Sequence, residues 1–311
     1  MRRSRPVTVS LVLGSGGARG LAHVGVIRWL EANGFRIVSI AGTSIGAMVG
    51  GIHAAGRLDA FERWARAITV PTIIAQMDFT WGRGGFVRGE RLIATLTSLA
   101  GDPRIEDLPI AFTAVAAQLG GGKEVWLRSG PLMGAIRASI SLPLLFTPVD
   151  HRGMKLIDGG VLNPVPIAAT LGDASDLTIA VNLSGPAQEE PPMPAAAAPA
   201  VVPEYGNFID RIADFLRGND PPRPDGGTDW GAYDVAYLAF DAMQGTIARQ
   251  KLAAHPPDRV IEISRSAFRT LAFDRAEEII ALGHARAAEV LGDLVTAGSE
   301  PAGGDAVPSG S

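Results

Sequence analysis

The sequence contains no cysteine among its 311 residues. Disulfides, thiol nucleophiles and metal sites ligated by thiolate are therefore excluded. Charge is also scarce, since charged residues make up 19% of the chain, and 28 Lys and Arg against 32 Asp and Glu leave a net charge of −4. Because this balance provides no excess of basic residues for a polyanion, we expect no nucleic-acid partner.

Long hydrophobic runs are missing as well. Glycine, proline or a charged residue interrupts every apolar stretch before the roughly 18 residues that a membrane span needs. The amino terminus, MRRSRPVTVSLVLGSGG, resembles a signal peptide only faintly, because its apolar run of about seven residues leads directly into a glycine loop. Cleavage there would destroy what we interpret as a functional strand and loop. We therefore expect a cytoplasmic protein, either free or peripheral at a membrane.

Hydrophobic residues and glycine, in contrast, are abundant, at 47% of the chain and 38 residues respectively. This composition is typical of a globular protein, and the glycine content predicts close approaches between backbones. Predicted strands span residues 7–13, 36–41, 110–117, 124–128, 155–157 and 177–183, and predicted helices span 21–32, 45–55 and 131–138. This alternation predicts an α/β fold with a mainly parallel central sheet and helices on both faces.

The composition changes after the last of these strands. We expect a catalytic core at 8–185, a mobile Pro/Ala-rich loop at 186–204, a mostly helical part at 205–296 that completes or packs on the core, and a disordered tail at 297–311. Within the helical part, helices are predicted at 205–216, 233–253 and 275–295, with one more strand at 259–263.

The segment 42–46, Gly-Thr-Ser-Ile-Gly, has the pattern of a nucleophile elbow. In such an elbow a serine lies on a sharp turn between a strand and a helix, and the flanking glycines let the two elements approach each other. The apolar strand before it and the small residues after it support this interpretation, with Ser44 as the nucleophile. The alternative is an ordinary turn serine that caps a helix.

The segment 14–20, Gly-Ser-Gly-Gly-Ala-Arg-Gly, precedes a predicted helix and offers a row of backbone N–H groups. Such a row binds an anion, either a phosphate or a developing oxyanion. A dinucleotide fingerprint is the rival, but the register that ends at Gly20 has Ser15 in place of its first glycine. The following strand also ends Ile40-Ala41-Gly42 without the required acidic residue, so a nucleotide-binding oxidoreductase is disfavoured.

A serine nucleophile needs a base, and none of the five histidines has supporting context. Asp158 is the better candidate, because it follows an apolar strand and precedes Gly159 and Gly160. Burial there would raise its pKa and suit it to accept a proton. The other Asp-Gly-Gly, at Asp225, lies among prolines in a polar break. The alternative for Asp158 is a turn aspartate without catalytic role.

Taken together, these ordered motifs resemble the patatin-like phospholipase family, in its bacterial cytosolic branch, over about residues 8–185. The resemblance implies a three-layer α/β sandwich and a Ser–Asp dyad without histidine, formed by Ser44 and Asp158. It implies no cofactor and no metal. It also implies the following sites: an oxyanion hole from the backbone of Gly16, Gly17, Ala18, Arg19 and Ile45, and motif glycines at Gly14, Gly20, Gly42, Gly46, Gly159 and Gly160.

The expected function is therefore a serine acyl hydrolase that acts on fatty acyl esters of phospholipids, lysophospholipids or related lipids. A catalytically weak acyl- or lipid-binding regulator on the same fold is the alternative. The Arg19 side chain would either bind a phosphate head group or anchor the glycine loop by an internal salt bridge. The segment 81–89, with Trp81 and Phe86, would touch a membrane surface, form a lid or fill a buried corner.

Overall fold

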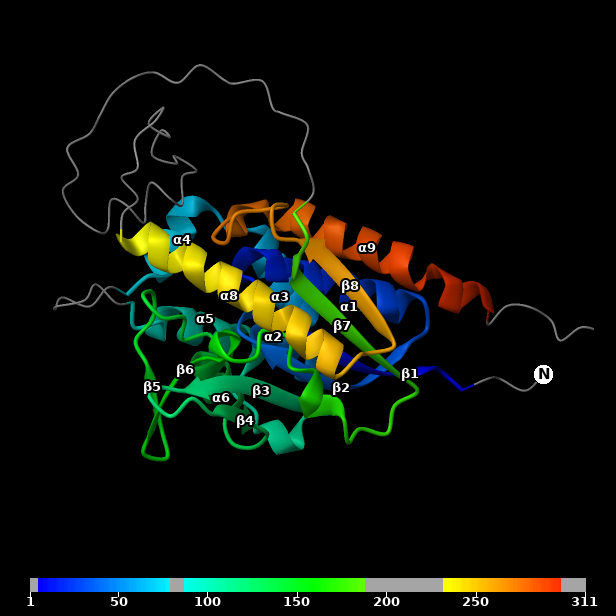
Figure 1. The fold of residues 1–311 in the computed structure, drawn as a ribbon, viewed down its shortest axis with the longest axis horizontal. Helices are drawn as coiled ribbons and strands as arrows, with labels where there is room; N and C mark the ends of the chain where they lie inside the picture. The colour runs from blue at the N-terminus through cyan, green and yellow to red at the C-terminus, as the bar shows by residue number, and fades with distance from the viewer. Residues whose placement is uncertain (1–4, 79–86, 188–231, 298–311) are drawn as a thin grey trace, which may run out of the picture.

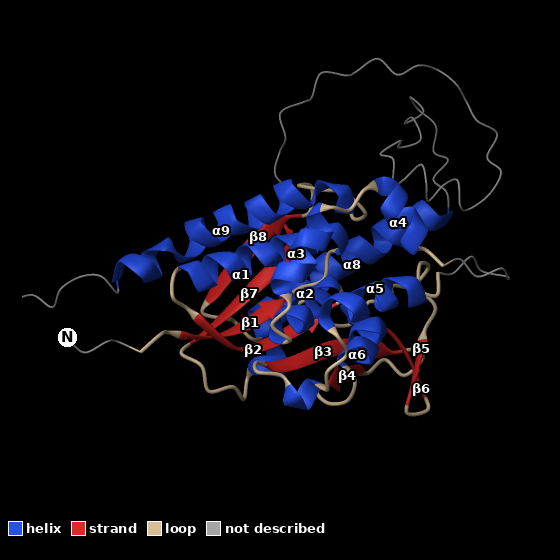
Figure 2. Cartoon of the chain, turned by 180° about the vertical axis from the view of Figure 1, so that it is seen from behind, coloured by secondary structure: helices blue, strands red, loops and turns tan. Residues whose placement is uncertain are grey.

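The computed structural model describes residues 5–78, 87–187 and 232–297. These residues form one mixed sheet with helices on both of its faces (Figures 1 and 2), so the predicted α/β class is confirmed. The predicted helix at 205–216, Trp81 and Phe86, the Asp225 motif and most of the expected loop and tail lie outside the described residues.

The sheet has eight strands in the order β5-β6-β3-β2-β1-β7-β8, with β4 paired to β3 beside this path. The strands are β1 (Thr8–Leu13), β2 (Arg36–Thr43), β3 (Ala111–Gln118), β4 (Glu124–Leu127), β5 (Val149–His151), β6 (Met154–Asp158), β7 (Leu177–Gly185) and β8 (Arg259–Ser264). The pairs among β3, β2, β1, β7 and β8 are parallel, whereas β4, β5 and β6 pair antiparallel. The sheet is therefore mainly parallel, as predicted.

The helices are α1 (Ala22–Ala32), α2 (Ile45–Ala54), α3 (Leu58–Arg66), α4 (Val70–Gln76), α5 (Glu90–Ala100), α6 (Leu132–Ser139), α8 (Ala232–Ala254) and α9 (Ala276–Ala297). The first helix begins one residue later than predicted, because Gly17–Leu21 forms a 3-10 turn before it. Helices α3, α4 and α5 were not predicted. No helix in the described ranges combines the length and the apolar character needed to cross a bilayer.

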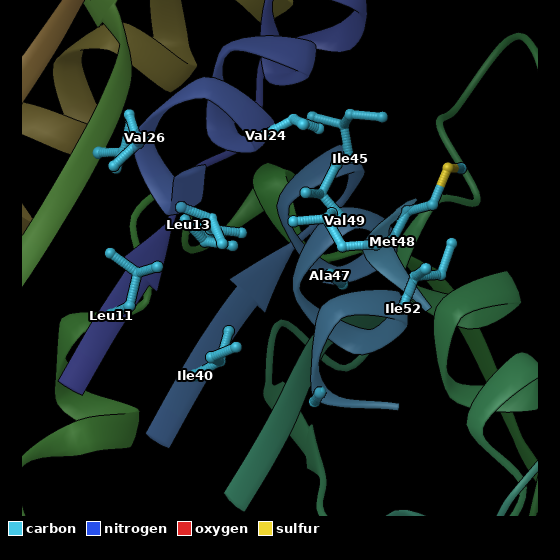
Figure 3. Close-up of a cluster of buried hydrophobic side chains, with 14 of the residues drawn as sticks. Leu11, Leu13, Val24, Val26, Ile40, Ile45, Ala47, Met48, Val49 and Ile52 are labelled. Atoms are coloured by element: carbon cyan, nitrogen blue, oxygen red, sulfur yellow. The ribbon is translucent and has the colours of Figure 1, made fainter. Parts of the chain in front are cut away.

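Strand β1 has consecutive apolar residues, Leu11, Val12 and Leu13, because both of its faces are buried. Leu11 and Leu13 belong to the large hydrophobic core beneath α1 and α2. Figure 3 shows them together with Ile40 of β2 and with apolar side chains of the two helices. Val12 points to the other face, where it packs in a small cluster with Ala180 of β7 and Ala248 of α8. Figure 1 shows α8 across the near face of the sheet, and Figure 2 shows α1, α2 and α9 across the opposite one.

The last third of the chain takes part in this architecture. Strand β8 extends the sheet beside β7, and α9 lies against α1 at a crossing built from glycine. A Cβ on Gly25 would lie 2.0 Å from the carbonyl oxygen of Ile280, and a Cβ on Gly283 would lie 2.0 Å from that of Ala22. The two helices are therefore in backbone contact, which is the kind of close approach that the glycine content predicts.

One edge of β3 brings the two predicted dyad residues together. Thr43, the last residue of β2, lies opposite Val115 of β3, and Asp158, the last residue of β6, lies opposite Ala116. Strand β4 pairs with residues 114–117 of β3 and so occupies one of its two edges. Strands β2 and β6 therefore pair with the opposite edge, where they lie end to end. They run toward each other, so the residue after β2 meets the end of β6.

The α1–α9 crossing yields a prediction with a control in the same helix. Gly283→Ala should lower the free energy of unfolding by about 1–3 kcal/mol, because the new methyl group has no room. Gly292→Ala should raise it by up to about 1 kcal/mol, because no heavy atom lies within 4 Å of the position of its Cβ. Urea unfolding measures both; equal effects from the two substitutions would contradict the close crossing.

Candidate active site

Ser44 lies at a strained turn between β2 and α2, with φ 58° and ψ −125°. A non-glycine residue in such a region costs about 1–3 kcal/mol and persists only where the surroundings hold it. Its N–H donates to Ser139 Oγ at 2.9 Å, and this hydroxyl donates to the carbonyl oxygen of Val115 at 2.6 Å. The last residue of α6 thereby ties the turn to β3.

The glycines of this turn are required by its dimensions. A Cβ on Gly46 would lie 2.1 Å from the carbonyl oxygen of Leu13, and a Cβ on Gly42 would lie 2.5 Å from that of Gly46. A Cβ on Gly20 of the glycine loop would lie 2.2 Å from Cγ2 of Ile45. Strand, helix and glycine loop therefore meet around Ser44 at distances that only glycine permits.

The hydroxyl of Ser44 does not cap α2, as the alternative interpretation would require. It donates instead to Asp158 Oδ2 at 2.6 Å. The other carboxylate oxygen, Oδ1, accepts the N–H of Gly160 at 2.7 Å, which is the bond of a turn aspartate. Asp158 therefore stabilises a turn with one carboxylate oxygen, as a turn aspartate does, and accepts the Ser44 hydroxyl with the other.

The Asp158 carboxyl group is 1% exposed. Burial raises its pKa from 3.8 to about 7, and the hydrogen bonds from Ser44 and from the Gly160 N–H oppose this rise. A group that titrates near neutrality at a hydrogen-bond distance from a hydroxyl can take up its proton. None of the five histidines, all of which are described, hydrogen-bonds to either residue of this pair.

The glycine loop is held by hydrogen bonds on both sides. The N–H of Gly14 donates to the carbonyl oxygen of Val181 at 3.0 Å, and the N–H of Ser15 donates to that of Pro164 at 2.8 Å. The N–H of Ala18, an expected oxyanion donor, donates to the carbonyl oxygen of Thr270 at 2.7 Å. Within the described residues it is therefore already engaged.

The other expected donors differ from Ala18. The N–H groups of Gly16, Gly17 and Ile45 find no acceptor in the part of the chain that the structure describes, whereas that of Arg19 lies inside the 3-10 turn Gly17–Leu21. Gly17 and Ile45 also line the same hollow as Ser44. Gly17 has a positive φ of 58°, and a Cβ there would lie 2.4 Å from the carbonyl oxygen of Thr270.

Arg19 is buried behind the loop, and its contacts are internal. Its Nε donates to the carbonyl oxygen of Gly16 at 3.2 Å, and its Nη1 donates to that of Arg265 at 2.5 Å. Its Nη2 pairs with Asp241 Oδ1 at 3.2 Å. Of the two interpretations of this side chain, the geometry agrees with an anchor for the loop rather than with a head-group ligand.

Two further buried polar side chains lie at the loop, those of His23 and Ser15. His23 is fully buried, and its Nε2 lies 2.9 Å from the carbonyl oxygen of Gly14. Burial lowers its pKa to about 4, so the ring is neutral and donates from Nε2. The Ser15 hydroxyl is buried and has no hydrogen-bond partner among the described residues, and a Cβ on Gly160 would lie 3.0 Å from it.

An apolar hollow opens beside Ser44, with about 1050 Å³ of open space including its mouth. It lies among α2, α3, α4, the segment after α6 and the segment after β8. Its lining in the described residues contains no charged side chain, and its largest members include Met48, Phe61, Trp64, Leu92, Leu145, Phe146, Leu271 and Phe273. Such a hollow suits an unbranched apolar group whose reactive end lies at Ser44.

A search of the described residues for three or more His, Asp or Glu side chains in reach of one metal ion finds no such group. The groups at this site that can take part in chemistry are the Ser44 hydroxyl, the Asp158 carboxyl group and the backbone N–H groups of the loop and of Ile45.

Comparison with known proteins places this site in a family. Residues 11–171 match the sequence profile described as patatin-like phospholipase. An uncharacterized NTE family protein of Mycobacterium tuberculosis is 38% identical over 94% of this chain and 93% of its own length. Lysophospholipase nte1 of Emericella nidulans is 29% identical over 94% of this chain, a region that makes up 19% of the fungal protein.

Among solved structures, VipD from Legionella pneumophila is similar with a TM-score of 0.49 and 13% identity, over 94% of this chain and 67% of that one. The profile match spans half of the chain, and the mycobacterial relative is similar along nearly all of it. This chain therefore belongs to the patatin-like phospholipase family.

Proposed function

We propose that this protein is a serine acyl hydrolase that cleaves the fatty acyl ester of a lysophospholipid, a phospholipid or a related lipid. The observation that carries the proposal is the 2.6 Å hydrogen bond from Ser44 Oγ to the buried Asp158, at the wall of the apolar hollow. Membership of the family and the lysophospholipase name of the fungal relative agree with it.

In the proposed reaction, Asp158 accepts the proton of Ser44 as the serine oxygen bonds to the ester carbonyl carbon. The carbonyl oxygen becomes an oxyanion that accepts the N–H groups of Gly17 and Ile45, with Gly16 as a further donor. Cleavage of the ester bond releases the alcohol, which takes its proton from Asp158. Water then gives a proton to Asp158 and attacks the acyl-serine, which releases the fatty acid and restores the hydroxyl.

The hollow supports the choice of substrate class. Burial of an alkyl chain against its apolar walls stabilises the complex in proportion to the area buried, and its described lining contains no charged side chain that could pair with a head group. We therefore place one acyl chain in the hollow and the head group outside it. We also propose that the enzyme works in the cytoplasm and meets its lipid by transient contact with a membrane surface.

A catalytically weak lipid-binding regulator is the second candidate from the sequence. It would need the hollow but not the contact between Ser44 and Asp158. Since both side chains are in place, hydrolysis is the better proposal. A soluble chromogenic ester separates the two, because a regulator would bind acyl chains and release no alcohol.

The proposed nucleophile can be tested by covalent labelling. A fluorophosphonate should modify Ser44 alone, because only an activated serine beside an oxyanion hole reacts quickly with it. Ser44→Ala should remove the label while the circular dichroism spectrum stays unchanged. Peptide mapping that found the label on Ser139 or Ser141 would contradict the assignment.

The proposed base can be tested with nearly isosteric substitutions. Asp158→Asn should lower turnover at least ~10²-fold, because it removes the proton acceptor. Asp225→Asn, in the second Asp-Gly-Gly, should leave turnover nearly unchanged, as should His255→Ala and His284→Ala. Initial rates on one soluble acyl ester provide the comparison. A folded histidine variant as inactive as Asp158→Asn would show that the base is misassigned.

The titration of Asp158 should move activity and stability in opposite directions. Because the base must be ionised, kcat/KM should rise as the pH increases through about 7. The unfolded carboxyl group ionises near 3.8, so the folded state holds the extra proton between these values. The stability that the protonated Asp158 provides is fully present below pH 3.8 and is lost progressively as the pH rises to about 7.

Wild-type protein should therefore lose stability relative to Asp158→Asn between about pH 4 and 7, by up to about 1.4 kcal/mol per pH unit, and the difference should level off above pH 7. Thermal unfolding of both proteins across this range isolates the contribution, since the other titrating groups are common to them. A stability difference independent of pH would mean that Asp158 is not a buried carboxyl group with a raised pKa.

A further inference from the structure

Arg19 and Asp241 form an ion pair beside the glycine loop, and neither belongs to the described lining of the hollow. The Arg19 side chain is 4% exposed and that of Asp241 is 26% exposed. Asp241 belongs to α8, far from the motifs in sequence. In the described residues it is the carboxylate with which Arg19 pairs, whereas the other two acceptors of the guanidinium, on Gly16 and Arg265, are backbone carbonyls.

The bond to Gly16 determines the direction of a neighbouring N–H. The carbonyl of Gly16 and the N–H of Gly17 belong to one peptide group, and in a trans peptide these two bonds point in opposite directions. No peptide bond in the described chain is cis. Because the Gly16 carbonyl faces Arg19, the Gly17 N–H faces away from Arg19. Gly17 itself lines the hollow together with Ser44.

Gly17 has little intrinsic preference for this orientation. Glycine populates positive and negative φ about equally, so the peptide can turn over unless an outside bond holds it. Thr270 holds the next N–H, that of Ala18, and Arg19 holds the Gly16 carbonyl. A buried guanidinium without a counter-charge is strongly unfavourable, so Arg19 stays in this place only while Asp241 faces it.

We propose that Arg19 and Asp241 are positioning residues that fix the Gly17 N–H as an oxyanion donor, with Asp241 acting through Arg19. The proposal rests on the proposed function, since the oxyanion is that of the ester reaction. It assigns a role in the reaction to α8, which contributes no residue to the hollow lining in the described chain.

The test compares Asp241→Asn with wild type in two binding measurements and one rate. An alkyl trifluoromethyl ketone forms a tetrahedral adduct with the serine, so its affinity depends on the oxyanion donors. A fatty acid amide of the same chain length depends on the hollow. Asp241→Asn should lower kcat and the ketone affinity by the same factor, about 10- to 100-fold. This is a smaller loss than the removal of an oxyanion donor causes, because the Gly17 N–H is misplaced and not removed. KM and amide affinity should not change.

Two further variants separate positioning from general damage. Asp241→Glu should restore most of the ketone affinity, because it returns the charge. Asp293→Asn removes a carboxylate that pairs with Arg259 at 3.0 Å on the surface between β8 and α9, and it should leave all three quantities unchanged. Circular dichroism checks that each variant is folded.

The outcomes are distinguishable. Asp241→Asn with wild-type kcat and ketone affinity would overturn the inference, and so would equal losses in ketone and amide affinity, which would indicate a collapsed hollow. In both cases wild-type protein would still react with the fluorophosphonate at Ser44. A wild-type protein that does not react would contradict the proposed function itself, and this inference with it.

Discussion

The register along one edge of β3 is the constraint on which the site depends. Val115 and Ala116 are consecutive residues, and they mark the places where β2 ends and β6 ends. Two strands that run toward each other on one edge must turn aside where they meet, and their side chains are then in contact. The hydrogen bond between Ser44 and Asp158 is the direct result. Ser139 secures this point by bonding to both the turn and the Val115 carbonyl.

The second constraint is the closeness of the backbones around Ser44. Elements that touch through glycine have little freedom to shift, because interiors are close-packed and small displacements create clashes. The turn can therefore keep Ser44 in an unfavourable conformation, and the buried Asp158 can keep a raised pKa. Both features reduce stability locally, and the dense packing of α1, α2, β1 and α9 offsets them. A rigid scaffold under a strained, partly buried pair is the arrangement expected of a preorganised site.

The sequence predicted the parts of this site that depend on local patterns. The strand–turn–helix around Ser44 and the strand before Asp158 are short segments whose alternation of apolar residues and glycine has a direct structural meaning. The contacts with Thr270 and Arg265 were not predictable, because a backbone carbonyl carries no residue-specific signal. Asp241 was missed for a related reason, since a single acidic residue in a long helix is usually solvated. Helices α3, α4 and α5 were not predicted, and they lie in the stretch between α2 and β3, which contains none of the motifs. The spacing of Leu58, Phe61 and Ala65, which α3 buries, is a helical pattern that could have predicted α3.

The segment after β8 contributes a wall of the hollow, and its Thr270 accepts the Ala18 N–H, although Thr270 lies 252 residues after Ala18 in the chain. A ribosome therefore completes both motifs and the Asp158 strand long before it makes the residues that finish the pocket. A nascent chain, or one truncated before Thr270, would carry Ser44 and Asp158 without one wall of the apolar hollow beside them. Synthesis order thus separates the appearance of the Ser44–Asp158 pair from the appearance of the finished hollow, so the activity proposed for this protein requires a chain made at least through Phe273.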